Sequence, residues 1–191
     1  MKVGADRIKE IVKSLRTFSR LDEAEMKAIN IHENIDSTLM ILQNRLKAKA
    51  DHPEIEIIKD YGDLPLVDCY AGQLNQVFMN LISNAIDVLD EQSKDKTFQY
   101  LTEHPNQITL KTRIVDEQIC IEISDNGLGI PPEKVQHIFD PFYTTKPIGK
   151  GTGLGLSISY QIVTEKHSGT LSCTSILGKG TTFTIKIPQK Q

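Results

Sequence analysis

The sequence predicts an α+β protein, a two-layer sandwich in which a mixed sheet carries helices on one face, preceded by an N-terminal amphipathic helix. Some segments repeat apolar residues at helical spacing, whereas others alternate apolar and polar residues as strands do. Two pairs of strand-like runs are separated by short turns, which is typical of hairpins. Because helices and strands do not follow a regular β–α–β order, a mixed sheet is expected rather than a doubly wound parallel one.

The first segment predicts an amphipathic helix from Asp6 to about Lys27. A single helix cannot bury an apolar stripe alone, so we expect it to pair with a second copy of the chain, with docking on the globular part as the alternative. We assign residues 1–29 to this partial dimerisation helix and residues 30–191 to the globular domain. The expected homodimer contact is formed by Ile8, Ile11, Leu15 and Phe18.

Helical spacing continues from Glu33 to Lys49 and from Ala71 to Glu91, and the segment from Ile55 to Tyr61 alternates like a strand. The polar segment 94–106 predicts a surface loop. The later elements are a hairpin of residues 108–115 and 118–124, a short helix 131–139, a helix 154–167 and a hairpin of residues 170–175 and 181–187. The irregular segment 140–150 is interpreted as a mobile lid.

The composition is that of an ordinary globular protein, with 191 residues, 39% of them hydrophobic, and a net charge of −3. A net charge this small does not indicate the strong electrostatic potential that attracts nucleic acid or a membrane surface. The separate Cys69, Cys120 and Cys173 indicate core or strand positions in a reducing compartment rather than disulfides or a zinc site. No apolar run approaches the roughly 20 residues that cross a bilayer, so a cytoplasmic fragment is expected, whether or not the full-length protein is membrane-anchored.

Two glycine-rich segments, 125–129 and 149–156, indicate a nucleotide site. Glycine allows close approach of the backbone, and a loop that opens a helix presents free N–H groups to phosphate. Neither segment fits a Walker loop or the dinucleotide fingerprint, whose glycines share one loop. The usual nucleotide-binding folds are therefore poor candidates.

Four polar side chains are candidates for binding the ligand. Asn80 and Asn84 lie four residues apart on one helix face, where their amides either bind Mg²⁺ and phosphate or make ordinary core hydrogen bonds. Asp125 follows a strand and can accept a hydrogen bond from an exocyclic amine, although Asp-Asn-Gly is also a common turn. Lys146, in the irregular segment 140–150, is either a phosphate contact or a solvated loop lysine.

Together these segments resemble the ordered boxes of the sensor histidine kinase catalytic domain, over about residues 30 to 188. The preceding helix resembles the second helix of that family's dimerisation and phosphoacceptor bundle. The motifs are Asn80-Leu-Ile-Ser-Asn84-Ala85, Asp125-x-Gly127-x-Gly129-Ile130, Phe139-Asp-Pro-Phe142-Tyr-Thr-Thr-Lys146, Gly151-Thr-Gly-Leu-Gly-Leu156 and Gly178-x-Gly180-Thr181. The resemblance implies the Bergerat ATP-binding sandwich of the GHKL superfamily, with ATP and Mg²⁺ as ligands and a response regulator receiver domain as the partner of the full-length kinase.

The resemblance implies a role for each matching residue. It assigns Asp125 to the adenine amine, Asn84 to Mg²⁺ and Asn80 to the phosphate side, and it makes Lys146 the catalytic charge near the γ-phosphate. The residues expected around the base are Gly127, Gly129, Ile130 and Thr181. Those expected at the phosphates are Gly151, Thr152, Gly153, Leu154, Gly155 and Leu156.

Two departures refine this expectation. Hydrolysing ATPases of the superfamily carry a glutamate at the position of Asn80, and an amide cannot act as the base for water, so transfer to a protein side chain is favoured over hydrolysis. Many kinases place an arginine after Phe-Tyr in the lid, where this chain has Thr144-Thr145-Lys146, which shifts the phosphate role onto Lys146.

The phosphoacceptor segment of such kinases is not recognisable here. His32-Glu33 matches only superficially, so the acceptor histidine is expected outside this fragment. The other histidines, expected at the surface or as capping residues, are His52, His104, His137 and His167. Two alternatives remain: a serine kinase of the anti-sigma-factor type, and a non-catalytic nucleotide-binding dimerisation scaffold.

Overall fold

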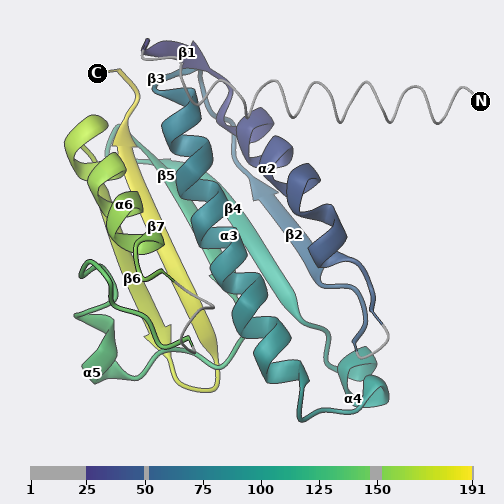
Figure 1. The fold of residues 1–191 in the computed structure, drawn as a ribbon. Coiled ribbons are helices and arrows are strands. Elements are labelled where there is room, and N and C mark those ends of the chain that lie inside the picture. The colour runs from purple at the N-terminus through teal and green to yellow at the C-terminus, as the bar shows by residue number, and fades with distance from the viewer. Residues whose placement is uncertain (1–24, 50–51, 147–151, 191) are drawn as a thin grey trace, which may run out of the picture.

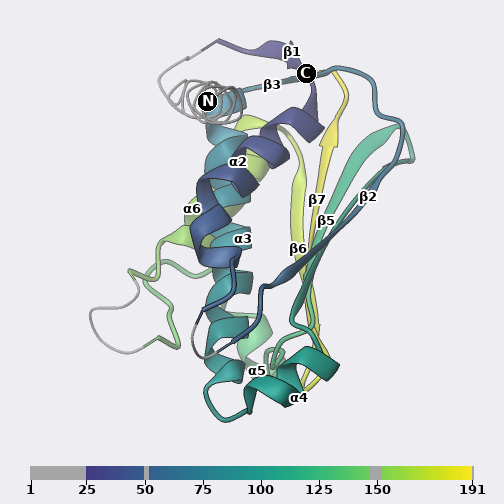
Figure 2. The ribbon, with the colours of Figure 1, turned by 90° about the vertical axis from the view of Figure 1, so that its right-hand side faces the viewer.

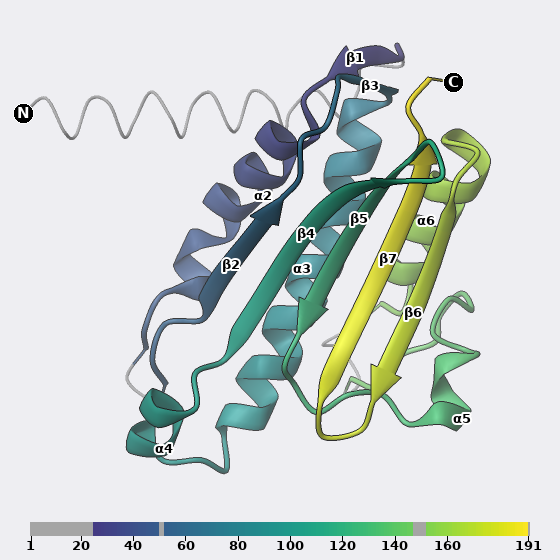
Figure 3. The ribbon, with the colours of Figure 1, turned by 180° about the vertical axis from the view of Figure 1, so that it is seen from behind.

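The computed structural model describes residues 25–49, 52–146 and 152–190. Its main sheet has five strands, with helices packed on one face and no described helix packed on the other (Figures 1, 2 and 3). In order across the sheet the strands are β2 (Glu56–Tyr61), β4 (Gln107–Val115), β5 (Gln118–Asp125), β7 (Gly180–Pro188) and β6 (Thr170–Ile176). The covering helices are α2 (Ile31–Leu46), α3 (Ala71–Ser93) and α6 (Gly155–Gln161). The predicted two-layer sandwich is confirmed.

The sheet is mixed, as expected. Strand β2 runs parallel to β4, whereas the other neighbours are antiparallel. The turn between β4 and β5 places Asp116 and Glu117 at φ of 50° and 62°, the left-handed region that a tight hairpin requires. The pairing of β5 with β7 sets Asp125 opposite Thr181, so two predicted site residues distant in sequence become neighbours.

Helix α3 forms the centre of the core. Its apolar stripe is fully buried against the sheet, and such side chains each contribute about 1.5–3 kcal/mol on burial. The stripe comprises Leu74, Val77, Phe78, Leu81, Ile82, Ile86 and Leu89. Among the described helices, none combines the length and apolarity needed to cross a bilayer. The cysteines lie in β3 (Val67–Cys69), β5 and β6 without disulfides, which confirms their expected strand positions.

Three short elements were not predicted. Lys27, the expected end of the first helix, instead begins strand β1 (Lys27–Ile29), which pairs with β3 (Val67–Cys69) in a second small sheet. The segment predicted as a loop contains helix α4 (Phe98–Glu103), whose first turn is capped by the Thr97 hydroxyl. Leu101 is its one buried residue, so no apolar period marks this helix.

One expected helix is shortened and another is divided, and most of the expected N-terminal helix lies outside the described residues. Helix α5 (Pro132–Val135) ends before Phe139, and the helix expected over 154–167 divides into α6 and the π-helical turn η2 (Ile162–Lys166). The stripe of Ile8, Ile11, Leu15 and Phe18 lies outside the described residues. The dimerisation helix and the boundary after residue 29 therefore stay predictions.

His167 joins the end of η2 to the start of α3. Its Nε2 accepts a hydrogen bond from the Tyr70 backbone N–H at 3.1 Å, and its Nδ1 lies 2.9 Å from the Ile162 carbonyl oxygen. Of the two expected roles, surface or capping, His167 has the capping role and is 0% exposed. The expected surface position is wrong for His52, which is 2% exposed. Contacts with residues distant in sequence bury both rings.

We expect this arrangement to make the fold sensitive to acid. Burial lowers the pKa of His167, partly opposed by its bond to Ile162. The unfolded chain therefore binds the proton more readily, so this contribution to stability is complete above about pH 6.5 and is lost as the pH falls through the lowered folded pKa, by at most about 1.4 kcal/mol per pH unit. Urea unfolding between pH 5 and 8 should show a shallower pH dependence for His167→Gln. An unchanged dependence would contradict this account.

Candidate nucleotide site

Asp125 ends β5 as a carboxylate in a partly buried position. Its Oδ1 accepts a hydrogen bond from the Gly127 N–H at 2.9 Å. Burial raises the pKa of Asp125, partly opposed by backbone hydrogen bonds from Gly127 and Thr181. Two N–H donors leave further acceptor capacity on an ionised carboxylate. The side chain can therefore accept one more hydrogen bond, from a ligand amine.

The loop after Asp125 packs against the turn between β6 and β7 so closely that glycine is required. Gly129 has φ of +72°, and a Cβ there would lie 2.3 Å from the Ile176 carbonyl oxygen. Gly180 has φ of +113°, and its Cβ would lie 1.9 Å from the Asp125 carbonyl oxygen. Any side chain at either position would push apart the two loops that flank Asp125.

A small hydrogen-bond cluster fixes the remaining residues expected around the base. The Ile130 N–H donates to Ser175 Oγ at 2.7 Å, and this hydroxyl also lies 2.9 Å from Thr181 Oγ1. Thr181 is only 5% exposed. The structure therefore brings Asp125, Ile130 and Thr181 together, and it adds Ser175, which no motif in the sequence indicated.

Asn80 connects α3 to the first turn of α6. Its Nδ2 donates to the Gly155 carbonyl oxygen at 3.0 Å and to Ser159 Oγ at 3.1 Å. An added Cβ on Gly155 would come within 3.5 Å of Asn80 Cγ, so the helices are in contact here. Of the two alternatives for this amide, the structure shows the hydrogen bond within the fold.

Helix α6 begins at the second glycine segment. Leu154 is its N-cap without a side-chain cap, and the Leu154 N–H reaches Thr152 Oγ1 at 3.3 Å. Gly153 has φ of +68°, and a Cβ there would lie 2.4 Å from the Phe142 carbonyl carbon, so this glycine packs on the Phe139–Phe142 box. Gly151 lies outside the described residues, and its phosphate role stays a prediction.

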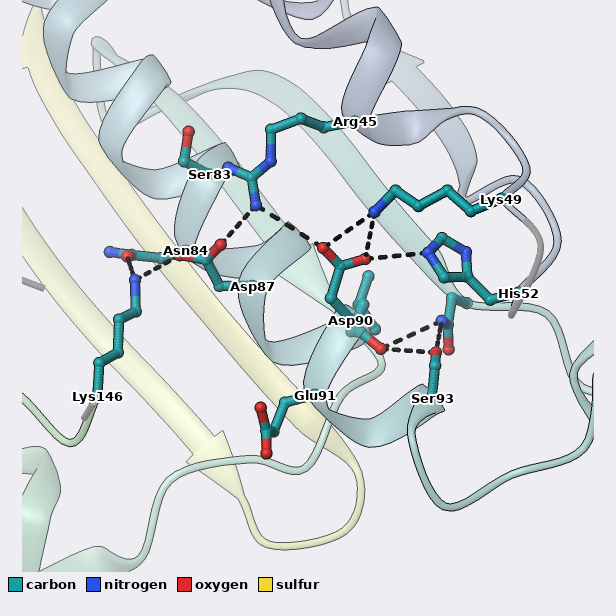
Figure 4. Close-up of polar contacts among 12 residues, drawn as sticks. Arg45, Lys49, His52, Ser83, Asn84, Asp87, Asp90, Glu91, Ser93 and Lys146 are labelled. Atoms are coloured by element: carbon teal, nitrogen blue, oxygen red, sulfur yellow. Dashed lines mark hydrogen bonds and ion pairs between the residues drawn. The ribbon is translucent and has the colours of Figure 1, made fainter. Parts of the chain in front are cut away.

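Asn84 contacts Lys146, one turn of α3 beyond Asn80. Lys146 Nζ lies 3.1 Å from Asn84 Oδ1 and also forms an ion pair with Asp87 Oδ2 (Figure 4). Arg45 from α2 pairs with the other oxygen, Asp87 Oδ1. Lys146 is therefore no solvated loop lysine. Sequence reasoning missed Asp87 and Arg45, although Asp87 lies three residues after Asn84 on the same helix face.

These two cations determine the charge state of Asp87. Burial raises its pKa, but hydrogen bonds and charge from Lys146 and Arg45 outweigh burial, and the net pKa is below the ordinary value. Arg45 also approaches Asp90 at 3.9 Å, and Lys49 lies 3.3 Å from the same carboxylate. A continuous charged row thus joins the end of α2 to α3 and reaches Lys146 (Figure 4).

The oxygen atoms of Asn84 and Asp87 suit a hard cation. Mg²⁺ prefers oxygen ligands and usually keeps several waters and substrate phosphates around one or two protein groups. No group of three or more His, Cys, Asp or Glu residues poised to hold a metal occurs within the described ranges. Asn84 Oδ1 and Asp87 Oδ2, which already face an ammonium group, fit a metal shared with nucleotide phosphates.

His32 is engaged in the fold and not presented as an acceptor. Its Nε2 lies 2.8 Å from Thr112 Oγ1, and its ring stacks on Tyr61 with a centroid distance of 4.3 Å. Burial lowers the pKa of His32, partly opposed by the nearby Asp36. That His32 is not the phosphoacceptor stays a prediction.

The sequence from residue 70 to residue 191 matches the family described as histidine kinase-, DNA gyrase B-, and HSP90-like ATPase. Sensor kinase CckA of Brucella abortus is 35% identical over 205 aligned residues, which cover 99% of this chain and 20% of that protein. Signal transduction histidine-protein kinase AtoS of Escherichia coli is 31% identical, over 96% of this chain and 27% of AtoS. The chain thus spans about a quarter or less of these relatives.

Solved structures share the fold. The catalytic domain of histidine kinase ThkA has a TM-score of 0.69 and 24% identity, covering 87% of this chain and 97% of that domain. Full-length ShkA in complex with AMPPNP has a TM-score of 0.68 and 22% identity, covering 97% of this chain and 36% of ShkA. ThkA in complex with response regulator protein TrrA has a TM-score of 0.64 and 22% identity, covering 98% of this chain and 49% of the matched chain.

Proposed function

Because this chain belongs to the histidine kinase-, DNA gyrase B-, and HSP90-like ATPase family, we propose that it is the catalytic module of a two-component sensor histidine kinase. It binds ATP with Mg²⁺ and transfers the γ-phosphoryl group to a histidine located outside residues 1–191. The observation that carries the proposal is the partly buried Asp125 carboxylate, framed by glycine loops and by Thr181, in a chain whose α3 also presents Asn84 to Lys146.

Each side chain has a defined task in this proposal. Asp125 accepts the exocyclic amine of adenine, and Gly127 and Gly129 let the backbone approach the base. Asn84 holds Mg²⁺, which when bound neutralises phosphate charge and orients the β- and γ-phosphates. Lys146 stabilises the charge that develops during transfer.

Asn80 supports transfer over hydrolysis. An amide cannot remove a proton from water, and here its N–H₂ group is already committed to Gly155 and Ser159. We infer that Asn80 acts on the phosphates indirectly, by holding the start of α6 in place. The backbone N–H groups there then face anionic charge, which the helix dipole favours.

The partners of the whole kinase follow from the same proposal. AMPPNP in the ShkA structure and the regulator TrrA in the ThkA complex support ATP and a response regulator receiver domain as binding partners here. A homodimer through Ile8, Ile11, Leu15 and Phe18 would bring the catalytic module to its acceptor. We place the module in the cytoplasm, where ATP is supplied.

A transfer assay tests this function. The chain is mixed with γ-labelled ATP, Mg²⁺ and a separately produced helical bundle that bears a histidine followed by an acidic residue, taken from a relative such as CckA. We expect label on the bundle as acid-labile, base-stable phosphohistidine, and none on a bundle with His→Gln. Acid-stable phosphoserine would instead indicate a serine kinase, and ATP binding without any transfer would indicate a scaffold.

A further inference from the structure

Two oxygen atoms of α3 converge on one cation. Asn84 Oδ1, an amide oxygen, and Asp87 Oδ2, a carboxylate oxygen, both contact Lys146 Nζ (Figure 4). The two residues are three positions apart, so their side chains leave the helix on the same face. Lys146 arrives from a separate segment of the chain. The contact is therefore a small cation site, built on a rigid helix and filled by a side chain.

Asn84 Oδ1 cannot contact Lys146 Nζ and Mg²⁺ at the same time. The Lys146 ammonium lies within hydrogen-bond distance of the oxygen that is proposed to bind the metal. Like charges at such a separation repel strongly in a partly buried site. Arrival of Mg²⁺ at Asn84 therefore requires Lys146 Nζ to leave this oxygen, and it frees Lys146 for the phosphates.

We propose that Asn84 Oδ1 and Asp87 Oδ2 form one cation site in which Lys146 and Mg²⁺ alternate, with Asp87 as the residue that draws the metal to Asn84. This inference rests on the proposed function, because it takes Asn84 as the Mg²⁺ ligand. It adds Asp87 to the site and makes Lys146 a competitor of the metal before it is a partner of the phosphates.

Charge determines which cation Asp87 favours. Coulomb energy scales with the product of the charges, so a carboxylate attracts Mg²⁺ about twice as strongly as an ammonium at equal distance. Arg45 holds the other oxygen of Asp87 and helps to keep the carboxylate ionised. Removing the Asp87 charge therefore weakens the binding of Mg²⁺ more than it weakens the contact with Lys146.

A simple salt bridge predicts a different outcome. If Lys146 and Asp87 only stabilise the fold, removing either partner breaks the same interaction, and both substitutions change nucleotide binding in the same direction. If they form an exchangeable cation site, the two substitutions act in opposite directions. Removing Lys146 eliminates the competitor, whereas removing the Asp87 charge eliminates the attraction.

The test is calorimetric titration of the full chain with ADP, with Mg²⁺ and with EDTA. ADP lacks the γ-phosphate, so the proposed contact of Lys146 with that group does not enter. The measured quantity is the ratio of ADP affinities with and without Mg²⁺. We expect Lys146→Met to raise this ratio about fivefold and Asp87→Asn to lower it about fivefold. A factor of about five is at the lower end of the range for coupling between sites, and we choose it because both side chains are 35% exposed and therefore screened by solvent.

Lys49→Met is the matched control. Lys49, which follows α2, pairs with Asp90 of α3 and not with Asn84 or Asp87 among the described ion pairs, so the ratio should not change. Equal ratios for all variants, or shifts of Lys146→Met and Asp87→Asn in the same direction, would overturn the exchange proposal and leave the proposed function intact. Failure of the wild-type chain to bind ADP with Mg²⁺ would overturn both.

Discussion

Replacement of Asp125 by asparagine is expected to remove the rise in melting temperature that ADP with Mg²⁺ gives the wild-type chain. Oδ1 accepts from Gly127, and the ligand amine needs another acceptor on the same group. An asparagine offers one oxygen and one N–H₂ group, so two donors would face each other there. Loss of a hydrogen bond to a charged group costs about 1.5–3 kcal/mol, or about 10- to 150-fold in affinity.

The size of the thermal effect follows from mass action. At a ligand concentration of about 100 Kd, binding stabilises the folded state by about 2.7 kcal/mol. A 100-fold weaker complex retains about 0.4 kcal/mol under the same conditions. Differential scanning fluorimetry resolves this loss, and a variant that keeps the full shift would refute the base-binding role of Asp125.

The same substitution should leave the ligand-free fold intact. Burial raises the pKa of Asp125, so the folded chain binds this proton more tightly than the unfolded chain. The contribution to stability is complete below the unfolded pKa of about 3.9 and is lost as the pH rises through the folded pKa. At pH 7 the partly desolvated charge of Asp125 is a cost that asparagine removes. We expect an equal or higher melting temperature without ligand, which separates lost binding from lost folding.

The long elements of the fold were predictable because each contains several repeats of the apolar pattern of a helix or a strand. Helix α3 shows several turns of buried apolar residues, and β4 and β5 flank a two-residue turn. Strand β3 has only three residues, and α4 buries one side chain, so neither contains enough of a period to be seen. Short elements like these are held by tertiary contacts and not by local pattern.

The polar part of the site was predictable in its residues but not in its pairings. Motif order indicated Asn84 and Lys146, but nothing local joins Lys146 to Asp87 or Asp87 to Arg45, which is 42 positions away. Asp87 lies outside the quoted motifs, the first of which ends at Ala85. Only the packing of α2 on α3 places Arg45 beside it and makes this carboxylate part of the site (Figure 4).

The two asparagines of α3 show why residue type alone did not distinguish their roles. Asn80 uses its N–H₂ group as a donor to acceptors in α6, whereas Asn84 uses its oxygen as an acceptor for Lys146. An identical change from Asn to Asp keeps the acceptor at residue 84 and destroys the donor at residue 80. Asn84→Asp is therefore the matched control for Asn80→Asp.

Asn80→Asp is expected to destabilise the chain strongly. The new carboxylate would face the Gly155 carbonyl oxygen, which already receives the Ser159 hydroxyl proton at 2.8 Å. Two hydrogen bonds are lost and two acceptors are set against each other in a partly buried contact. Unpaired polar groups of this kind cost about 1–3 kcal/mol each, so we expect a loss of about 3 kcal/mol.

Urea unfolding and hydrogen exchange measure this loss and locate it. For a domain of this size the melting temperature should fall by about 6–12 °C, and amides of 155–161 should lose protection first. Asn84→Asp should remain within about 1 kcal/mol of the wild type, because Lys146 can pair with the new carboxylate. Equal stability of both variants would mean that Asn80 does not hold α6, and the indirect role given to it in phosphate binding would fail with it.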